Sequence, residues 1–273
     1  MTIKTRNRLT FSLFIFSLAF LLANIIFFLL ALYNKSFSLE IFQNNSSSTH
    51  TNFLIKYNPL ITFISLYFEI IYVCVTSYLL FRVFEKTQAT DISYFFLFLI
   101  SLIANSFRIW LPLFNMASTY SNLLLFCGNS ILFSKLLMPL SLLFSVIMSG
   151  VEQRQDLEKN MVLLLIGCIF FAQIIPLNTA KLCMNFEVDY SYRNVIKVAS
   201  ILVIMATLIA LFFQNRQHFY TQLTTLGLAL IIAGTFFLFN STNILRLLIS
   251  FILLLSGDIY YLKELHKQYL WND

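Results

Sequence analysis

Charge is the scarcest property of this 273-residue chain. Only 11% of its residues are charged, whereas 59% are hydrophobic and the mean hydropathy is +0.81. Soluble globular domains carry about 25% charged residues, and a single soluble core of this size could not bury so much apolar surface. The composition therefore excludes an ordinary water-soluble domain and predicts a protein whose solvent is the lipid bilayer.

Glycine and proline are also scarce, with six and four copies, whereas phenylalanine occurs 31 times and tyrosine 13 times. The apolar runs are continuous, and they lack the alternation of polar and apolar residues that is typical of a transmembrane β-barrel. We therefore predict an all-α membrane protein, in which residues 1–273 form a single integral membrane domain.

Motifs for catalysis and metal binding are missing as well. The chain contains no GxSxG, HExxH or P-loop motif. Its four cysteines form no CxxC pair and its three histidines stand outside the apolar runs, so no zinc, iron–sulfur or haem site is readable. We expect no cofactor and no metal, and the sequence does not favour an enzyme. Whether Cys127 and Cys183 form a disulfide stays open.

Eight apolar segments reach the roughly 20 residues that a membrane-spanning helix needs. They are Thr10–Tyr33, Pro59–Phe84, Ile92–Phe114, Asn122–Ser149, Met161–Leu177, Asn194–Phe213, Leu223–Phe239 and Ile244–Leu262. The turn Asn240–Asn243 between the last two is tight, so seven spans are the alternative. The first segment exceeds the apolar region of about 7 to 15 residues in a signal peptide, and we expect it to be an uncleaved span.

The basic residues give the chain a net charge of +6 but stand between the apolar runs, without a basic stripe or docking motif. We therefore expect no nucleic-acid partner. Their distribution is a topology signal, because lysine and arginine favour cytoplasmic loops. With the N-terminus inside, ten lie on the cytoplasmic side, six on the other side and two within spans. This bias predicts an N-in/C-in arrangement.

The expected topology leaves two longer outer loops, about 34–58 and 178–193, and a short cytoplasmic tail, 263–273. The cytoplasmic links are too short to fold into a domain. We therefore expect any signal to pass through a partner protein, either in the membrane or in the cytoplasm. The lipid bilayer is the other expected partner.

Ionisable residues within spans are rare and costly, so each is a functional candidate. The candidates for ligand binding or ion pairing are Glu69, Arg108, Lys135, Arg246 and Asp258. Both arginines stand near the outer ends of their spans, where the simplest expectation is that their side chains extend to the interface. Asp258 stands near the predicted inner end of the last span, where we expect an exposed carboxylate.

Glu69 lies ten residues into a 26-residue span and should be near the middle of the membrane. A carboxylate at that depth is either protonated or paired with a cation. One hypothesis is a buried pair with Lys135 or Arg108 that fixes the packing of the helices. The other is a polar cavity open to the outer face, in which Arg108, Lys135 and Arg246 attract an anion.

These features predict a sensor-like or accessory membrane subunit that binds a small or anionic ligand, a lipid headgroup included, from the outer face. The alternatives are a small secondary transporter, with Glu69 and Lys135 lining the path, and a purely structural subunit of a membrane complex. The layout of Ile92–Pro176 resembles the membrane-embedded half of bacterial multi-helix sensor proteins, although the resemblance carries no functional residue. The expected location is the cell membrane, and most simply a bacterial inner membrane.

Overall fold

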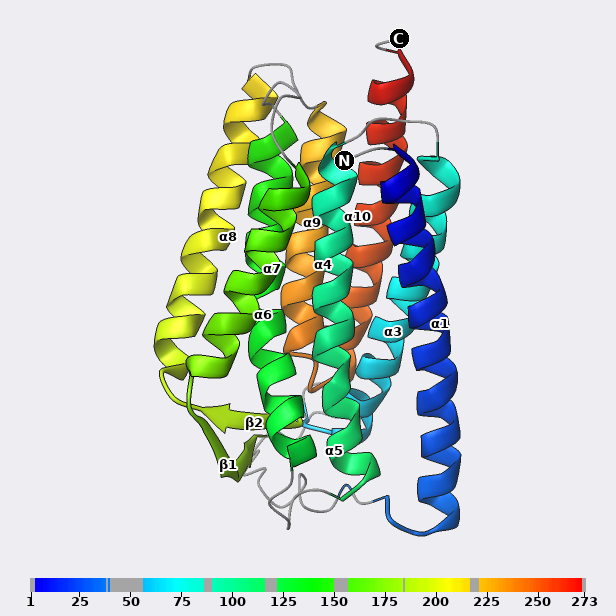
Figure 1. Ribbon diagram of the computed structural model, residues 1–273, viewed down its shortest axis with the longest axis vertical. Helices are drawn as coiled ribbons and strands as arrows, with labels where there is room; N and C mark the ends of the chain where they lie inside the picture. Colours follow the sequence, from blue (N-terminus) through cyan, green and yellow to red (C-terminus); the bar gives the residue numbers. More distant parts are fainter. Residues whose placement is uncertain are drawn as a thin grey trace.

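The structure is a computed structural model that describes residues 3–37, 39, 56–85, 90–115, 122–149, 157–183, 185–216 and 221–271. These residues form a bundle of long helices that run roughly along one axis, with a small β-hairpin at one end (Figure 1). Both chain termini lie at the other end of the bundle. We refer to the two ends as the hairpin end and the terminal end.

Eight of the described helices are long and apolar enough to cross a membrane. They are α1 (Ile3–Tyr33), α3 (Pro59–Val83), α4 (Thr90–Ser106, continued by two short helical segments to Leu113), α6 (Asn122–Ser149), α7 (Leu157–Ile174), α8 (Arg193–Arg216), α9 (Gln222–Phe239) and α10 (Ile244–Trp271). They match the expected all-α bundle of a multi-pass membrane protein. The tight turn between α9 and α10 separates two helices, so the count is eight and not seven.

Local sequence signals set several helix boundaries. Asn58 caps α3, because its side-chain oxygen accepts a hydrogen bond from the Leu60 backbone N–H at 2.9 Å. Pro59 follows at the first helical position, where its missing N–H is not needed. Thr221 caps α9 in the same way by accepting from the backbone N–H of Thr224.

The third span is interrupted near the hairpin end. Helix α4 ends at Ser106, a 3-10 turn η1 covers Phe107–Ile109, and the short helix α5 covers Trp110–Leu113. A proline ring clashes with the carbonyl group four residues earlier in an α-helix. Because Pro112 lies four residues after Arg108, the backbone departs from α geometry at Arg108.

The last helix is longer than predicted. Residues 263–271, which we expected to form a tail, continue α10 up to Trp271. Leu265 is buried among the core residues, and His266 stacks edge-on against Phe84. These residues of the expected tail are therefore helical, and His266 holds them against the end of α3.

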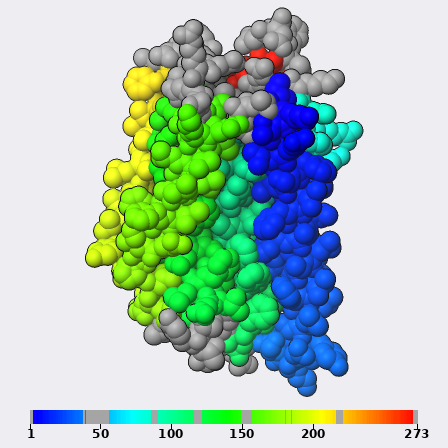
Figure 2. Space-filling view, viewed as in Figure 1, coloured from blue at the N-terminus to red at the C-terminus, as the bar shows by residue number. Residues whose placement is uncertain are grey.

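Helix α4 forms the centre of the bundle. In its most apolar window 89% of the residues are buried, compared with 17% in α1 and in α8. Helix α1 lies along one outer edge of the molecule (blue in Figure 2) and exposes apolar side chains such as Phe16 and Leu22. An apolar helix that faces lipid has no need of a polar outer face, so this exposure fits a bundle in a bilayer.

Helices α9 and α10 approach each other closely through glycine. A Cβ atom on Gly227 would lie 2.6 Å from the backbone nitrogen of Tyr261, and one on Gly257 would lie 2.9 Å from the carbonyl oxygen of Gly227. Gly234 makes a similar approach to Leu254. Small residues let the backbones of membrane helices come together in this way.

The segment expected as an outer loop at 178–193 folds mainly as an antiparallel hairpin of β1 (Leu177–Cys183) and β2 (Glu187–Tyr190). Phe186, at the turn, has a positive φ of 56° and a fully buried side chain. It packs with Val188 against apolar residues of α3, α5 and α6. The hairpin is thus part of the bundle core, and this places Glu187, between these two residues, inside the protein.

Candidate functional site

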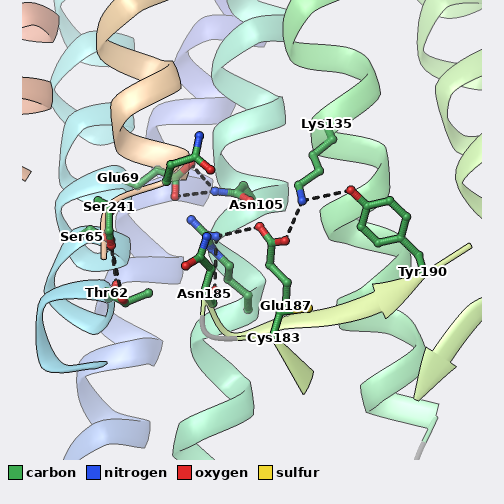
Figure 3. A network of polar contacts seen from close by, with 12 residues as sticks. Thr62, Ser65, Glu69, Asn105, Lys135, Cys183, Asn185, Glu187, Tyr190 and Ser241 are labelled. Atoms are coloured by element: carbon green, nitrogen blue, oxygen red, sulfur yellow. Dashed lines mark hydrogen bonds and ion pairs between the residues drawn. The ribbon is translucent and has the colours of Figure 1, made fainter. Parts of the chain in front are cut away.

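Glu187 is the centre of a buried network of charges at the hairpin end. Its side chain is 3% exposed. Lys135 Nζ lies 2.7 Å from Glu187 Oε2, and Arg108 Nη1 lies 3.3 Å from Oε1 (Figure 3 shows the contact with Lys135). Arg193 Nη2 completes the network at 3.4 Å from Oε2. One carboxylate therefore joins three cations from α6, η1 and α8.

The surroundings of Glu187 keep it ionised. Burial alone would raise the pKa of its carboxyl group. The charge of Lys135, the charge of Arg108, the hydrogen bond from Lys135 and the charge of Arg193 act in the opposite direction, and together they hold the pKa below its usual value. The site therefore contains a carboxylate that is ionised at neutral pH and that orients the neighbouring basic side chains.

Two of these cations have further partners. Lys135 Nζ donates a hydrogen bond to the Tyr190 hydroxyl at 3.2 Å and lies 5.1 Å from the centre of that ring. Arg193 Nη1 lies 3.6 Å from Asp189 Oδ1. The Nε atom of Arg193 is buried without a hydrogen-bond partner among the described residues.

The cysteines near this network are free thiols. Arg193 Nη1 donates to Cys183 Sγ at 2.9 Å, and the Cys127 thiol donates to the Phe107 carbonyl oxygen at 3.6 Å. Burial raises the pKa of the Cys183 thiol even though Arg193 opposes this effect. Cys127 and Cys183, whose pairing the sequence left open, form no disulfide in the structure.

A cavity of about 470 Å³, which we call the hairpin cavity, opens beside the charge network. It is bounded by α6, the hairpin, α8, and the ends of α9 and α10 that face the hairpin. Its charged lining residues are Lys135, Glu187, Arg193, Lys197 and Arg246. Four cations against one carboxylate leave an excess of three positive charges. Arg108 and Asp189 pair with lining residues but do not line the cavity themselves. Their opposite charges cancel, so the excess is unchanged.

Lys197 and Arg246 differ from the other cations of the hairpin cavity in that both are exposed. Arg246 Nη1 donates to the Asn240 carbonyl oxygen at 3.2 Å and to Thr242 Oγ1 at 3.4 Å. Neither cation pairs with a carboxylate within the described part of the chain. The charge excess of the cavity is therefore concentrated at its rim.

The opposite end of the hairpin cavity is apolar. Along α8 the lining residues nearest the hairpin are mainly polar (Arg193, Lys197 and Ser200, with Ile196 among them), and Ile201 and Ile204 follow. The eleven helical steps from Arg193 to Ile204 span about 16 Å at the rise of an α-helix. Phe236 and Phe237, near the end of α9 that faces the hairpin, add apolar surface to the cavity. Along α8 the lining thus changes from mainly basic to apolar.

Glu69 pairs with neither of the cations that the sequence suggested. It is fully buried, and Asn105 Nδ2 donates to both of its carboxylate oxygens at 2.9 Å (Figure 3). Arg108 and Lys135 bind Glu187 instead. The hypothesis of a Glu69–Lys135 or Glu69–Arg108 pair was therefore wrong. The hairpin brings in a second carboxylate, Glu187, whose position could not be predicted from the depth of residues along the helices.

The expectations for Arg108 and Asp258 are also corrected. Arg108 is only 1% exposed and does not reach the interface, because η1 turns it toward Glu187. Asp258 is buried and accepts a hydrogen bond from the Tyr72 hydroxyl at 2.9 Å. The exposed carboxylate was expected near the end of a helix, but α10 continues thirteen residues beyond Asp258.

Of the five candidates, Lys135 and Arg246 line the hairpin cavity, and Arg108 supports it through Glu187. Glu69 and Asp258 are not among its lining residues. Glu187, Tyr190, Arg193 and Lys197 were missed as site residues. The alternating pattern of Glu187–Tyr190 is typical of a β-strand, and this signal could have shown that the supposed loop folds against the bundle.

Within the described ranges, no group of three or more His, Cys, Asp or Glu side chains is placed to hold a metal ion. A scan against protein-family models found no match for the chain, and no curated protein and no solved structure matches it.

Proposed function

We propose that this membrane protein is a sensor-like or accessory subunit that binds an anionic ligand in the hairpin cavity. The observation that carries the proposal is the excess of three positive charges around a cavity of about 470 Å³. A cleft that is lined by charge of one sign, with walls of low polarity, concentrates ligands of the opposite sign. Electrostatic attraction is also stronger there than in bulk water.

The cations of the hairpin cavity have two roles in this proposal. Lys197 and Arg246, at the rim, make the first contact with the anion. Lys135 and Arg193 are held by Glu187 and present ordered donors deeper in the cavity. The planar guanidinium of arginine suits the oxygens of phosphate and carboxylate groups. Phosphate and carboxylate share this chemistry, and either could provide the anionic group.

We place the hairpin end on the outer face of the membrane, with both termini in the cytoplasm. The support is the bias of ten basic residues against six, together with the position of both termini at one end (Figure 1). Our proposal locates the protein in the cell membrane, most simply a bacterial inner membrane. A signal would then pass from the hairpin cavity to a partner at the terminal end.

A secondary transporter is the second candidate. It is supported by the buried carboxylates of Glu69 and Asp258 within spans, since such groups often carry protons in transporters. A transporter needs a polar route that leads from the hairpin cavity to the terminal end. The receptor is favoured because Lys135 lines the cavity whereas Glu69 does not. Uptake that depends on Glu69 would reverse this preference.

Binding of inorganic phosphate and of an anionic lipid to the purified full chain tests the proposal. The double variant Lys197→Gln/Arg246→Gln should lower the affinity for an anion by at least tenfold, and added salt should weaken binding to the wild type. Lys181→Gln is the control, because Lys181 is exposed on β1 and does not line the hairpin cavity. Equal affinities of the wild type and the double variant would leave the structural subunit as the surviving role.

A further inference from the structure

We propose that the ligand of the hairpin cavity is a membrane lipid with a phosphomonoester headgroup, and that it enters sideways from the bilayer between α8 and α9. This inference rests on the proposed function and names the class of its ligand. The headgroup occupies the basic end beside Lys135 and Arg193, and one hydrocarbon chain lies along the apolar residues Ile201 and Ile204 of α8.

The side opening of the hairpin cavity supports lateral entry. Ile201 of α8 and Phe236 of α9 both line the cavity, yet they are 52% and 51% exposed. Side chains that line a cavity and are also half exposed mark its mouth. The mouth therefore lies on the apolar flank of two spans, where the surrounding medium is hydrocarbon. A ligand that is itself dissolved in the bilayer reaches this mouth directly.

The order of the lining residues along α8 matches a lipid in shape and polarity. Arg193, Lys197 and Ser200 make the part nearest the hairpin mainly polar, although Ile196 lies among them, and Ile201 and Ile204 follow toward the middle of the helix. The row of lining residues from Arg193 to Ile204 is about 16 Å long, which is longer than a phosphate group. Its apolar half would contribute nothing to the binding of a free phosphate, whereas it would cover several methylene groups of a lipid chain.

The amount of charge indicates the headgroup. A phosphomonoester carries close to two negative charges at neutral pH, whereas a phosphodiester carries one. The two negative charges of a phosphomonoester would neutralise most of the excess of three positive charges that line the hairpin cavity. Lys197 and Arg246 are exposed and pair with no carboxylate among the described residues, and the planar guanidinium of Arg246 suits terminal phosphate oxygens. Phosphatidic acid is therefore the appropriate probe.

The test compares three ligands on the purified full chain in detergent: phosphatidic acid, phosphatidylglycerol and inorganic phosphate. Ile204→Trp fills the apolar end of the hairpin cavity. Leu202→Trp is the matched control, because Leu202 lies two residues away on α8, is 64% exposed and does not line the cavity. We expect phosphatidic acid to bind at least tenfold more tightly than the other two ligands. Ile204→Trp should lower the affinity for phosphatidic acid at least tenfold and change the affinity for inorganic phosphate by less than twofold. Leu202→Trp should change neither affinity.

A photoreactive phosphatidic acid with its label in the acyl chain provides a second measurement on the unmodified protein. Crosslinks to residues of α8 and α9 that line the hairpin cavity support lateral entry, and crosslinks confined to other helices overturn it. Equal affinities for phosphatidic acid and inorganic phosphate show that the ligand is a free anion, so this inference fails while the proposed function stands. If no anion responds to Lys197→Gln/Arg246→Gln, the proposed function fails as well.

Discussion

Arg108 and Glu187 form a buried ion pair, with Nη1 of the arginine 3.3 Å from Oε1 of the glutamate, although 79 residues separate them in the chain. A guanidinium that is 1% exposed needs a counter-charge, because isolated buried charges are very costly. Pro112 interrupts the α-helix at Arg108, and the hairpin supplies the carboxylate. The pair therefore ties the third span to the hairpin, and the hairpin forms one wall of the cavity.

Glu187→Gln should destabilise the protein strongly, because it leaves the buried Arg108 without a negative partner. Removing one member of a buried ion pair costs about 3–5 kcal/mol. The control is Asp189→Asn, since Asp189 is 22% exposed and, among the described residues, pairs only with the partly exposed Arg193. We expect a cost of at most about 1 kcal/mol there. Thermal unfolding in detergent measures both, and equal shifts of Tm would contradict a central role for Glu187.

The ionised state of Glu187 should make stability depend on pH. The pKa of this carboxyl group is lowered in the folded protein. Its contribution is therefore fully present above the unfolded pKa of about 4.3, and it is lost as the pH falls through the folded pKa. Between about pH 7 and pH 3, the Tm of the wild type should fall more steeply than that of Glu187→Gln. Parallel curves for the two proteins would be inconsistent with a lowered pKa.

Gly227→Ala should weaken the contact of α9 with α10. The added methyl group would lie 2.6 Å from the backbone nitrogen of Tyr261, which cannot move without shifting the helix. Overpacking of this kind costs about 1–3 kcal/mol. Gly167→Ala on α7 is the matched control, because its Cβ would meet no atom within 4 Å. There, the higher helix propensity of alanine should leave stability equal or slightly higher. The Tm of Gly227→Ala and that of Gly167→Ala, each compared with the Tm of the wild type, measure the two effects.

Tyr72→Phe should leave the buried Asp258 carboxyl group without its hydroxyl donor. An unsatisfied buried polar group costs about 1–3 kcal/mol. Tyr260→Phe, at an exposed tyrosine on the same helix as Asp258, should have little effect. Because removing both partners can be nearly neutral, Tyr72→Phe/Asp258→Leu should recover part of the lost stability. A double variant that is less stable than Tyr72→Phe would show that Asp258 has another essential contact.

Cysteine labelling tests the orientation in the membrane. Ser191 is exposed at the hairpin end and Lys159 is exposed at the start of α7, at the terminal end. We expect a membrane-impermeant maleimide added from outside to label Ser191→Cys and to spare Lys159→Cys until the membrane is opened. Unsubstituted protein provides the background from the native cysteines. Outside labelling of Lys159→Cys alone would reverse the proposed sidedness.

Hydropathy alone was enough to predict the eight apolar helices. Hydropathy is summed over about 20 neighbouring residues, so segments such as Asn122–Ser149 could be predicted without knowing what they contact. The same local reading selected Lys135 and Arg246, since a charge in an apolar run is conspicuous.

The partner of each buried charge could not be predicted from the sequence and became known from the packing of the folded chain. Depth along a helix does not tell which neighbouring side chain lies beside it, so Glu69 was assigned to cations that in fact bind Glu187. Glu187 lies outside the apolar runs, and its burial follows from the insertion of Phe186 and Val188 into the bundle. Spans follow from local hydropathy, whereas the hairpin cavity depends on contacts between residues far apart in the chain.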